Sequence, residues 1–387
     1  MLNKGVPSTF PNIKALYSDP EKKAIIEELV LGYSAGKGAN GSADGEVNGD
    51  HSDRFEESVT YFLAQHYNYH KSRDLEKALG YIDKLIEQNP KSVDYTQAKA
   101  RIYKHYGNIK KASETMSHAR ELDHKDRYIN TKCAKYQLRD NQNEAALETM
   151  SKFTRNETVG GPLGDLHDMQ CMWYITEDGE AYLRQRNFGL ALKRFNSIAD
   201  IFEIWHDDQF DFHSFSLRKG QIRAYIEMVR WEDHLRDHPF FTRAAISAVK
   251  IYLALADNPD LGNPNKELNL ENMDAAERKK ARQKAKKEQE KQDKIEAEKK
   301  LAAAKKANAA GEGESKKEDP DPKGLLLLQT KEPLEASLKF LTPLLEFTPK
   351  NIEAQNLGFE VHFRRSESFD RHAPMHTNTQ QRSISLP

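Results

Sequence analysis

RYINTKCAKYQLRDNQNEAALETM, residues 127–150, is the stretch that decides the fold. It consists of two helix-forming segments separated by a turn at Asp140 and Asn141. A small residue stands in each segment, Ala134 in the first and Ala146 in the second, 12 positions apart. Two helices approach closely only where the side chains between them are small. The stretch therefore predicts a hairpin of two packed helices.

The same arrangement returns along the chain at a fixed period. Ala78, Ala112 and Ala146 stand 34 residues apart, and Ala191 follows 45 residues later. A repeat of 34 residues built as helix, turn and helix is the tetratricopeptide (TPR) pattern. The 11 extra residues of the last step match NETVGGPLGDL (156–166), a Gly/Pro-bearing loop insertion of the kind that hairpin tips tolerate. Small residues precede three of the alanines by 12 positions, namely Ala100, Ala134 and Gly179.

These repeats predict an all-α fold, a TPR-type helical-hairpin solenoid with a charged extended helix and a disordered tail. Composition divides the chain around four TPR-like repeats. The predicted segments are a helical lead-in (1–34), a flexible Gly-rich loop (35–56), the four repeats (57–203), a longer helix pair (204–258), a charged basic helix and linker (259–324), a returning helical pair (325–363) and a disordered tail (364–387).

The longer helix pair is expected within residues 211–255, with a break at Pro239. Upstream of the break, Ile222, Tyr225, Ile226 and Val229 follow helical spacing. Apolar residues at this spacing form one face of a helix. We therefore expect an amphipathic helix here.

Composition and motifs exclude several classes of protein. Net charge is −1, so any preference for nucleic acid must come from a segment. Cys133 and Cys171 are the only cysteines, and they belong to no CxxC or Cys/His cluster. A disulfide framework and a zinc module are therefore not expected, and a reducing compartment is the natural one. The first 30 residues do not form a signal peptide, and no apolar run approaches the ~18 residues of a membrane span. We expect a soluble intracellular protein.

No constellation of residues indicates catalysis or metal binding. The loop GYSAGKGAN (32–40) lacks the spacing of a phosphate loop and follows a helix, so it is read as a flexible linker. His66 and His70 stand four residues apart but have no third ligand nearby, which favours a surface or packing role. GxSxG, HExxH and catalytic Cys/His groupings are absent. We expect no catalytic residues, no metal site and no enzymatic activity.

Basic residues share one stripe of the first helix in the deciding stretch. Lys132, Lys135 and Arg139 lie on this stripe, beside an apolar one. One repeat earlier, Arg101 occupies the position equivalent to Lys135, and Lys104 lies one turn on. In a stacked solenoid, equivalent positions of successive repeats become neighbours in space. These side chains are therefore expected to meet on the concave surface.

Like charges held this close repel one another unless an anion lies between them. Arg127 stands at the start of the same helix, where free N–H groups also attract anions. Two interpretations remain open. The stripe is either a solvated basic face or a site for a polyphosphate, an acidic peptide or RNA.

Residues 277–306 are strongly basic, with 13 Lys or Arg against 6 Asp or Glu. They are helix-forming but have almost no apolar stripe, so they cannot bury a face. Such a segment is typical of sequence-independent attraction to phosphates, and a solvated single helix held by charge pairs is the alternative. The candidate RNA contacts are Arg278, Lys279, Lys280, Arg282, Lys284, Lys286 and Lys287.

Several stretches together resemble the auxiliary subunit of N-terminal acetyltransferase A, over about residues 5–350. They are VPSTFPNIKALYSDPEKKAIIEELV, RIYKHYGNIKKA, RYINTKCAKY, MQCMWYITE, DDQFDFHSFSLRK and LRDHPFF, followed by the Lys-rich helix. The resemblance implies a TPR superhelix that wraps a small catalytic acetyltransferase subunit. It also implies anchoring to ribosomes for co-translational N-terminal acetylation, contact of the basic helix with ribosomal RNA, and a location in the cytoplasm, with the nucleus as a further compartment.

The resemblance also implies sites. The motifs RIYKH and RYINTK would supply a basic pocket for inositol hexakisphosphate, a structural ligand and not a catalytic cofactor. Tyr128 and Trp173 would belong to the interface with the catalytic subunit, although an ordinary buried tryptophan is an equal alternative for the second. No membrane partner is implied. The pocket residues would be Arg101, Lys104, Arg127 and Lys132, with Lys135 beside them.

The chain also departs from the family pattern. Repeats that normally precede VPSTF and helices that normally follow residue 360 are missing, so we expect an internal or truncated portion of such a subunit. The rival hypothesis from another class is a peptide-binding TPR adaptor that grips acidic C-terminal tails with the same basic surface. A general RNA-associated scaffold driven by 277–306 is a third.

Overall fold

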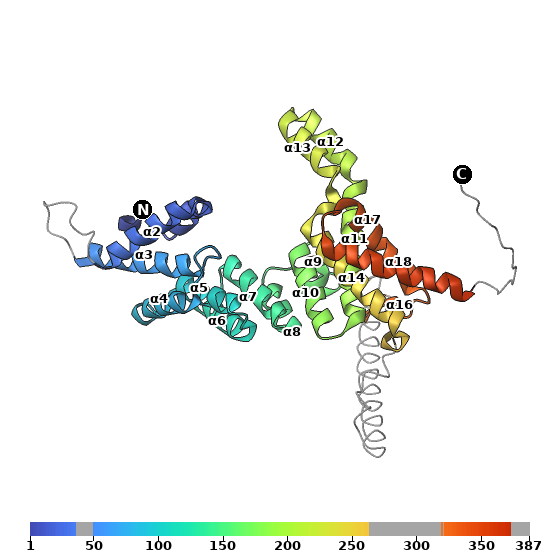
Figure 1. Ribbon diagram of the computed structural model, residues 1–387, viewed down its shortest axis with the longest axis horizontal. Coiled ribbons are helices and arrows are strands. Elements are labelled where there is room, and N and C mark those ends of the chain that lie inside the picture. The colour runs from blue at the N-terminus through green and yellow to red at the C-terminus, as the bar shows by residue number, and fades with distance from the viewer. Residues whose placement is uncertain (36–48, 263–318, 320, 373–387) are drawn as a thin grey trace, which may run out of the picture. The chain divides into compact units, whose positions relative to one another are not determined.

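The computed structural model describes residues 1–35, 49–262, 319 and 321–372, and within these ranges all regular structure is helical (Figure 1). This confirms the predicted all-α class. The charged helix and most of the predicted tail lie outside the described residues. The chain forms two compact units, residues 1–165 and 166–387, which are described separately.

Consecutive helices of the first unit pack as antiparallel hairpins. The repeats expected from the period are α3 with α4, α5 with α6 and α7 with α8, and each hairpin also contacts the next, α4 on α5 and α6 on α7. The elements of this unit are η1 (Leu2–Lys4), α1 (Thr9–Ile13), η2 (Lys14–Ser18), α2 (Pro20–Ser34), α3 (Gly49–Asn68), α4 (Leu75–Gln88), α5 (Val93–His105), α6 (Ile109–Leu122), α7 (Arg127–Arg139) and α8 (Asn143–Ser151); α9 (Gly161–Asp168) ends in the second unit.

Local sequence fixes where these helices begin and turn. The side chains of Ser92, Asn108 and Asp126 accept hydrogen bonds from the first free backbone N–H groups of α5, α6 and α7. Such caps stabilise a helix start by about 1 kcal/mol. Gly107 and Asn141 occupy the left-handed region, with φ of 80° and 61°, at the turns of the α5–α6 and α7–α8 hairpins. The hairpin geometry is therefore encoded in the turn residues.

The small residues of the repeat lie where the helices cross. Ala78, Ala100, Ala112, Ala134 and Ala146 are all fully buried. A larger side chain at these positions would separate the backbones of the paired helices. The reading of these alanines from the period is confirmed.

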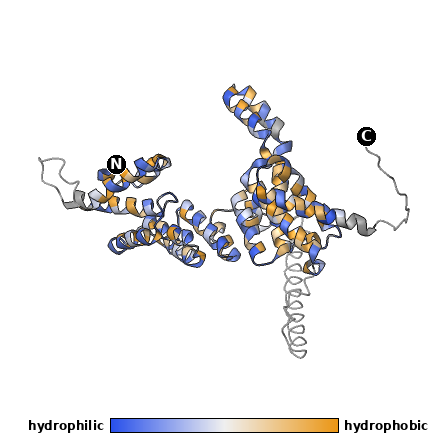
Figure 2. Cartoon of the chain, viewed as in Figure 1, coloured by the Kyte–Doolittle hydropathy of each residue, from blue (hydrophilic) through white to orange (hydrophobic). Residues whose placement is uncertain are grey.

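The second unit contains the fourth predicted hairpin, α10 (Met172–Arg184) with α11 (Phe188–Asp207). At their crossing, a Cβ atom added to Gly179 would lie 2.7 Å from the Phe195 ring, so only glycine fits. The core of the unit gathers apolar side chains from α10, α11, α14, α17 and α18, as the orange interior faces in Figure 2 indicate. The further elements are α12 (Gln209–Arg218), α13 (Ile222–Glu232), η3 (Leu235–Asp237), α14 (Pro239–Asp257), η4 (Pro259–Gly262), α16 (Leu325–Leu328), α17 (Pro333–Phe347) and α18 (Ile352–His372).

Helix α14 is long and apolar enough, by length and composition alone, to cross a membrane. The prediction that no segment reaches this limit is therefore wrong for Pro239–Asp257. The helix packs against α11 and α17, and 56% of its apolar window is buried inside the second unit. Burial in the core accounts for its composition, because a central helix is apolar on nearly all sides.

Three sequence expectations need correction. Residues 211–255 form α12, α13 and α14 rather than two long helices, because the chain turns at Gly220 (φ 68°) as well as before Pro239. Within this region α13 is the helix expected at Ile222–Val229, and its apolar face is exposed, since Ile222 is 63% and Ile226 43% exposed. The insertion 156–166 is partly helical, since α9 begins at Gly161. Helix α18 also continues past residue 363, where the tail was expected to begin.

Candidate anion-binding site

Helices α5 and α7 bring the basic stripe together around one cavity of about 240 Å³ in the first unit. The two helices are the first helices of consecutive hairpins, so residues 34 positions apart lie next to each other. Arg101 and Lys135 accordingly line the same cavity, as the stacking of repeats predicts. The lining residues are Gln97, Arg101 and Lys104 from α5, Met116 from α6, and Lys132, Lys135, Tyr136 and Arg139 from α7.

The electrostatics of the cavity centre on Lys104, which lies half-buried between the two helices. The pKa of its ammonium group is lowered to about 8, mainly by burial and then by Arg139, Arg101, Lys132 and Lys135 in that order. All four of these neighbouring charges are positive. The cavity therefore concentrates positive potential, which an anion would relieve.

Not every cation of the cavity is paired with a carboxylate. In the part of the chain that the structure describes, Arg101, Lys104 and Lys132 form no ion pair with Asp or Glu. The Lys132 ammonium lies 5.2 Å from the ring centroid of Tyr128, a cation–π contact that leaves its charge in place. These groups are consequently available to a ligand that carries negative charge.

His105 lies beside Lys104 but adds no positive charge at neutral pH. Burial lowers its pKa to about 4, and Lys104, Arg73 and Arg101 act in the same direction. Its Nδ1 atom lies 2.6 Å from the carbonyl oxygen Oδ1 of Asn68. Because that oxygen can only accept, the neutral ring donates its Nδ1–H to Asn68. His105 therefore anchors α5 to α3 rather than binding the anion.

Arg127 does not line the cavity. Its side chain is exposed, and its guanidinium carbon lies 6.0 Å from the ring centroid of Phe153. One N–H group at the start of α7 is already taken, since the Asp126 carboxylate accepts from the Tyr128 N–H at 2.8 Å. A carboxylate at this helix start repels a second anion. Arg127 therefore has no part in the cavity wall, and an anion at the N-terminus of α7 stays a prediction.

Tyr128 lies at the edge of the cavity and Trp173 in the second unit. The Tyr128 hydroxyl accepts a hydrogen bond of 3.2 Å from the Gln97 amide, and 52% of the side chain is exposed. Trp173 is half-buried on α10, with its ring centroid 5.6 Å from that of Tyr174. Both retain exposed surface, and their place in an interface stays a prediction.

Sequence reasoning left Gln97, Tyr136 and Arg139 out of the site. Arg139 was on the basic stripe and Gln97 stands one turn before Arg101, so the helical period could have found both. Tyr136 lies on the neighbouring apolar stripe of the helix, and it is both buried and part of the cavity wall. An uncharged residue in a basic pocket carries no signal in composition.

The other sequence candidates fall elsewhere. Arg278, Lys279, Lys280, Arg282, Lys284, Lys286 and Lys287 lie outside the described residues. His66 is buried in the first unit, where its Nδ1 atom lies 2.7 Å from the Tyr17 hydroxyl, and this is the predicted packing role. Among the described residues, no group of three or more His, Cys, Asp and Glu is arranged to hold a metal ion.

Comparisons with known proteins agree over nearly the whole chain. The family model for N-terminal acetyltransferase A, auxiliary subunit, matches residues 1–371. N-alpha-acetyltransferase 16, NatA auxiliary subunit, of Mus musculus is 45% identical over 376 residues, which cover 94% of this chain and 43% of the mouse protein. The N-terminal acetyltransferase A complex auxiliary subunit NAA15 of Arabidopsis thaliana is 40% identical over 372 residues, covering 95% of this chain and 40% of the plant protein.

A solved structure also resembles this chain in sequence and fold. A chain in the structure of Naa15/Naa10 bound to HypK-THB is 46% identical, with a TM-score of 0.71, and the match covers 95% of this chain and 45% of that one. The chain thus spans less than half the length of the relatives that it matches.

Proposed function

The chain belongs to the family of auxiliary subunits of N-terminal acetyltransferase A, and from this premise we propose that it is a non-catalytic helical scaffold for the catalytic subunit of that complex. The similarity to a chain in the Naa15/Naa10 structure supports the proposal. Stacked hairpins present a continuous concave surface on which a folded partner can rest. The acetyl transfer itself would be carried out by groups of the partner.

The basic cavity between α5 and α7 is the observation that carries a second part of the proposal. We propose that it binds inositol hexakisphosphate, a ring that presents phosphates in several directions. Arg101 would hold a phosphate through paired N–H donors, while the ammonium groups of Lys104, Lys132 and Lys135 act as point charges. Binding would return the pKa of Lys104 toward its ordinary value, because each phosphate offsets the neighbouring cations.

A polyphosphate in this place would also help the scaffold to bind its partner. The cavity is partly open, so part of the ligand would remain accessible to basic residues of the catalytic subunit. Two positively charged surfaces that share one polyanion attract each other through it, although they would repel without it. The ligand would therefore act as a structural bridge, and it would be required for assembly rather than for chemistry.

The segment 277–306 supports a further part of the proposal, contact with ribosomal RNA in the cytoplasm. Its excess of Lys and Arg provides sequence-independent attraction to phosphates. Such attraction weakens steeply with salt. Deletion of 277–306 is expected to abolish co-sedimentation with ribosomes at low salt, and co-sedimentation of the deleted chain equal to that of the full chain would contradict this contact.

Calorimetric titration of the purified chain with inositol hexakisphosphate tests the anion site. Arg101→Gln with Lys135→Gln is expected to weaken binding by about tenfold or more, because each charge-assisted contact contributes about 1.5–3 kcal/mol. Lys125→Gln with Lys152→Gln is the matched control, since both lysines are exposed in the same unit and lie outside the cavity. Equal affinities in the two double variants would refute the assignment.

Capture of the purified catalytic subunit, with and without inositol hexakisphosphate, tests the scaffold. We expect the chain to retain the catalytic subunit and the ligand to strengthen retention. Binding of an acidic peptide alone, with no retention of the catalytic subunit, would support the peptide-binding adaptor instead.

A further inference from the structure

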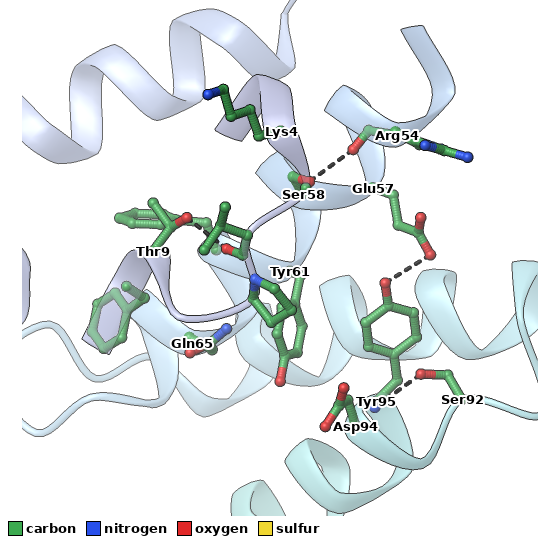
Figure 3. A pocket seen from close by; sticks show the side chains of 15 residues that line it. Lys4, Thr9, Arg54, Glu57, Ser58, Tyr61, Gln65, Ser92, Asp94 and Tyr95 are labelled. Atoms are coloured by element: carbon green, nitrogen blue, oxygen red, sulfur yellow. Dashed lines mark hydrogen bonds between the residues drawn. The ribbon is translucent and has the colours of Figure 1, made fainter. Parts of the chain in front are cut away.

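A second cavity of about 320 Å³ lies in the first unit, between residues 4–10, α3 and the start of α5 (Figure 3). Its walls are aromatic. The Tyr61 and Tyr95 rings lie 5.1 Å apart at a tilt of 55°, and the Phe10 and Phe62 rings meet edge to face at 5.4 Å. Its volume is sufficient for one long side chain.

Two carboxylates, Glu57 and Asp94, face this cavity. The Tyr95 hydroxyl donates to Oε1 of Glu57 at 2.7 Å, which leaves the second oxygen of that carboxylate for another donor. Asp94 lies at the same end of the cavity as the Tyr61 hydroxyl (Figure 3). Within the described residues neither carboxylate forms an ion pair with a lysine or an arginine. The cavity therefore carries negative charge near both ends of the Tyr95 side chain, from Glu57 beside its hydroxyl and from Asp94 near its backbone (Figure 3).

Burial is the main influence on the two tyrosines. The pKa of Tyr61 is raised to about 12, chiefly by burial and then by Asp94, while Arg101 opposes the rise. Burial and the hydrogen bond to Glu57 raise the pKa of Tyr95 as well. Both hydroxyls therefore stay neutral, and the faces of the two rings add cation–π attraction to a cation in the cavity.

The cations that line the cavity do not cancel this charge. In Figure 3 the Lys4 ammonium and the Arg54 guanidinium point away from Glu57 and Asp94. The phenyl groups of Phe10 and Phe62 would cover the methylene stem of a long basic side chain while the carboxylates receive its head. The ammonium head would donate to the Asp94 carboxylate and the Tyr61 hydroxyl at one end of the Tyr95 ring, and the Glu57 carboxylate at the other end adds to the negative potential (Figure 3).

The second cavity adjoins the basic one. Asp94 and Arg101 lie two turns apart on α5, and Arg101 acts electrostatically on Tyr61. A partner that covers one cavity therefore reaches the other. This adjacency favours a polypeptide over a free amine as the source of the cation.

We propose that the cavity between residues 4–10, α3 and α5 receives the side-chain ammonium group of a lysine that the catalytic subunit presents next to the basic cavity. The inference rests on the proposed function, since that function supplies the partner. Opposite charges in adjacent cavities would fix the register of the partner, because a shifted partner would place its lysine against Lys104.

The test uses the full chain, the purified catalytic subunit and inositol hexakisphosphate. Glu57→Gln with Asp94→Asn removes both charges, and the glutamine carbonyl can still accept from Tyr95. Glu114→Gln with Glu148→Gln is the matched control, because both glutamates are exposed in the same unit and lie outside the cavity. Calorimetry is expected to give about tenfold weaker binding for the first pair, as for the loss of a close charge pair, and a change within about twofold for the control.

Zero-length coupling with a carbodiimide, which joins a carboxylate to an amine in contact, identifies the lysine. A peptide of the catalytic subunit joined through lysine to Glu57 or Asp94 is the expected product. Absence of this product from the wild-type complex overturns the inference, as does affinity within about twofold of wild type for the cavity variant. Absence of binding by the wild-type chain overturns the proposed function and the inference together.

A folding control keeps the test decisive. Thermal unfolding followed by circular dichroism compares the cavity variant with the wild-type chain. If the double variant fails to fold, Asp94→Asn alone replaces it, because the Asp94 side chain is exposed. A threefold or greater loss of affinity for this single variant, together with the cross-link, upholds the inference, and a smaller loss overturns it.

Discussion

Replacing Lys104 with methionine is expected to stabilise the free chain at pH 7, although it removes a charged group from a functional site. Lys104 is charged in both the folded and the unfolded chain at this pH. In the folded chain, however, burial and four neighbouring cations disfavour that charge, which is why its pKa falls to about 8 from 10.5. Methionine is of similar length and carries no charge, so it removes the repulsion and keeps most of the packing.

The magnitude follows from the pKa shift. A fall from 10.5 to about 8 corresponds to about 3 kcal/mol of free energy. Solvent around the half-buried group screens part of this, so the expected gain is about 1–2 kcal/mol. For a unit of this size, each kcal/mol raises the melting temperature by about 2–4 °C.

The pH dependence has a defined sign. Because the folded pKa is the lower one, the unfolded chain binds more protons between pH 8 and pH 10.5, and the stability of the wild-type chain rises over this window. The advantage of Lys104→Met is therefore full below pH 8 and shrinks above it. Saturating inositol hexakisphosphate should reverse the order at pH 7, since the ligand binds the charged lysine better.

Urea unfolding of the wild-type chain, Lys104→Met and the exposed control Lys125→Met, at pH 7 and pH 9.5, measures the effect. We expect only Lys104→Met to raise the unfolding midpoint at pH 7, and the rise to diminish at pH 9.5. A destabilised Lys104→Met, or a gain that is equal at both pH values, would refute the view that repulsion among the cavity cations stores this free energy.

Further predictions concern the neighbouring residues. Arg127→Gln should leave the affinity for inositol hexakisphosphate within about twofold of wild type, whereas Arg139→Gln should lower it about tenfold, because Arg139 lines the cavity and Arg127 does not. Titration calorimetry measures both affinities, and equal losses would contradict this placement of the two arginines. Gly179→Ala should destabilise the second unit by about 1–3 kcal/mol in urea, because its Cβ would lie 2.7 Å from Phe195; an unchanged midpoint would show that α10 and α11 can separate. Tyr17→Phe should destabilise the first unit by about 1 kcal/mol, because His66 loses its hydrogen bond. The wild-type unit should also lose stability as the pH falls below 6.5. Burial lowers the pKa of His66 in the folded chain, so the neutral ring stabilises the fold above pH 6.5 and this stabilisation is lost on acidification. A free energy of urea unfolding that does not change below pH 6.5 would exclude this contribution of His66.

The period of the sequence was sufficient to predict the cavity because the solenoid converts separation along the chain into proximity in space. Arg101 and Lys135 are neighbours for the same reason that Ala112 and Ala146 are both buried, since each pair stands one repeat apart. The prediction needed only the repeat length of 34 residues and the knowledge of which helix in each hairpin carries the basic residues.

The errors have local physical causes. Arg127 was placed in the site by its position at the helix start and by the resemblance, but it lies outside the cavity wall, and the preceding Asp126 has taken one of the N–H groups that an anion would need. Ile222 and Ile226 were correctly placed on one helical face, but periodicity identifies a face without identifying what covers it. Glu57 and Asp94 gave no signal because they lie in different helices without an equivalent spacing, so only their meeting at one cavity reveals them.

The two cavities together are consistent with the proposed role as a scaffold. Free energy is stored as repulsion where Lys104 is surrounded by cations, and a polyanion bound there would release it. Negative charge lies beside this site at Asp94 on the same helix, α5, and at Glu57 on α3. A partner with only basic residues would be attracted at the cavity of Glu57 and Asp94 and repelled at the cavity of Lys104 until the polyanion was bound there. Assembly would then depend on the ligand through charge alone, with no change of backbone conformation, and raising the salt concentration should weaken the effect of the ligand and of the Glu57→Gln and Asp94→Asn changes in parallel.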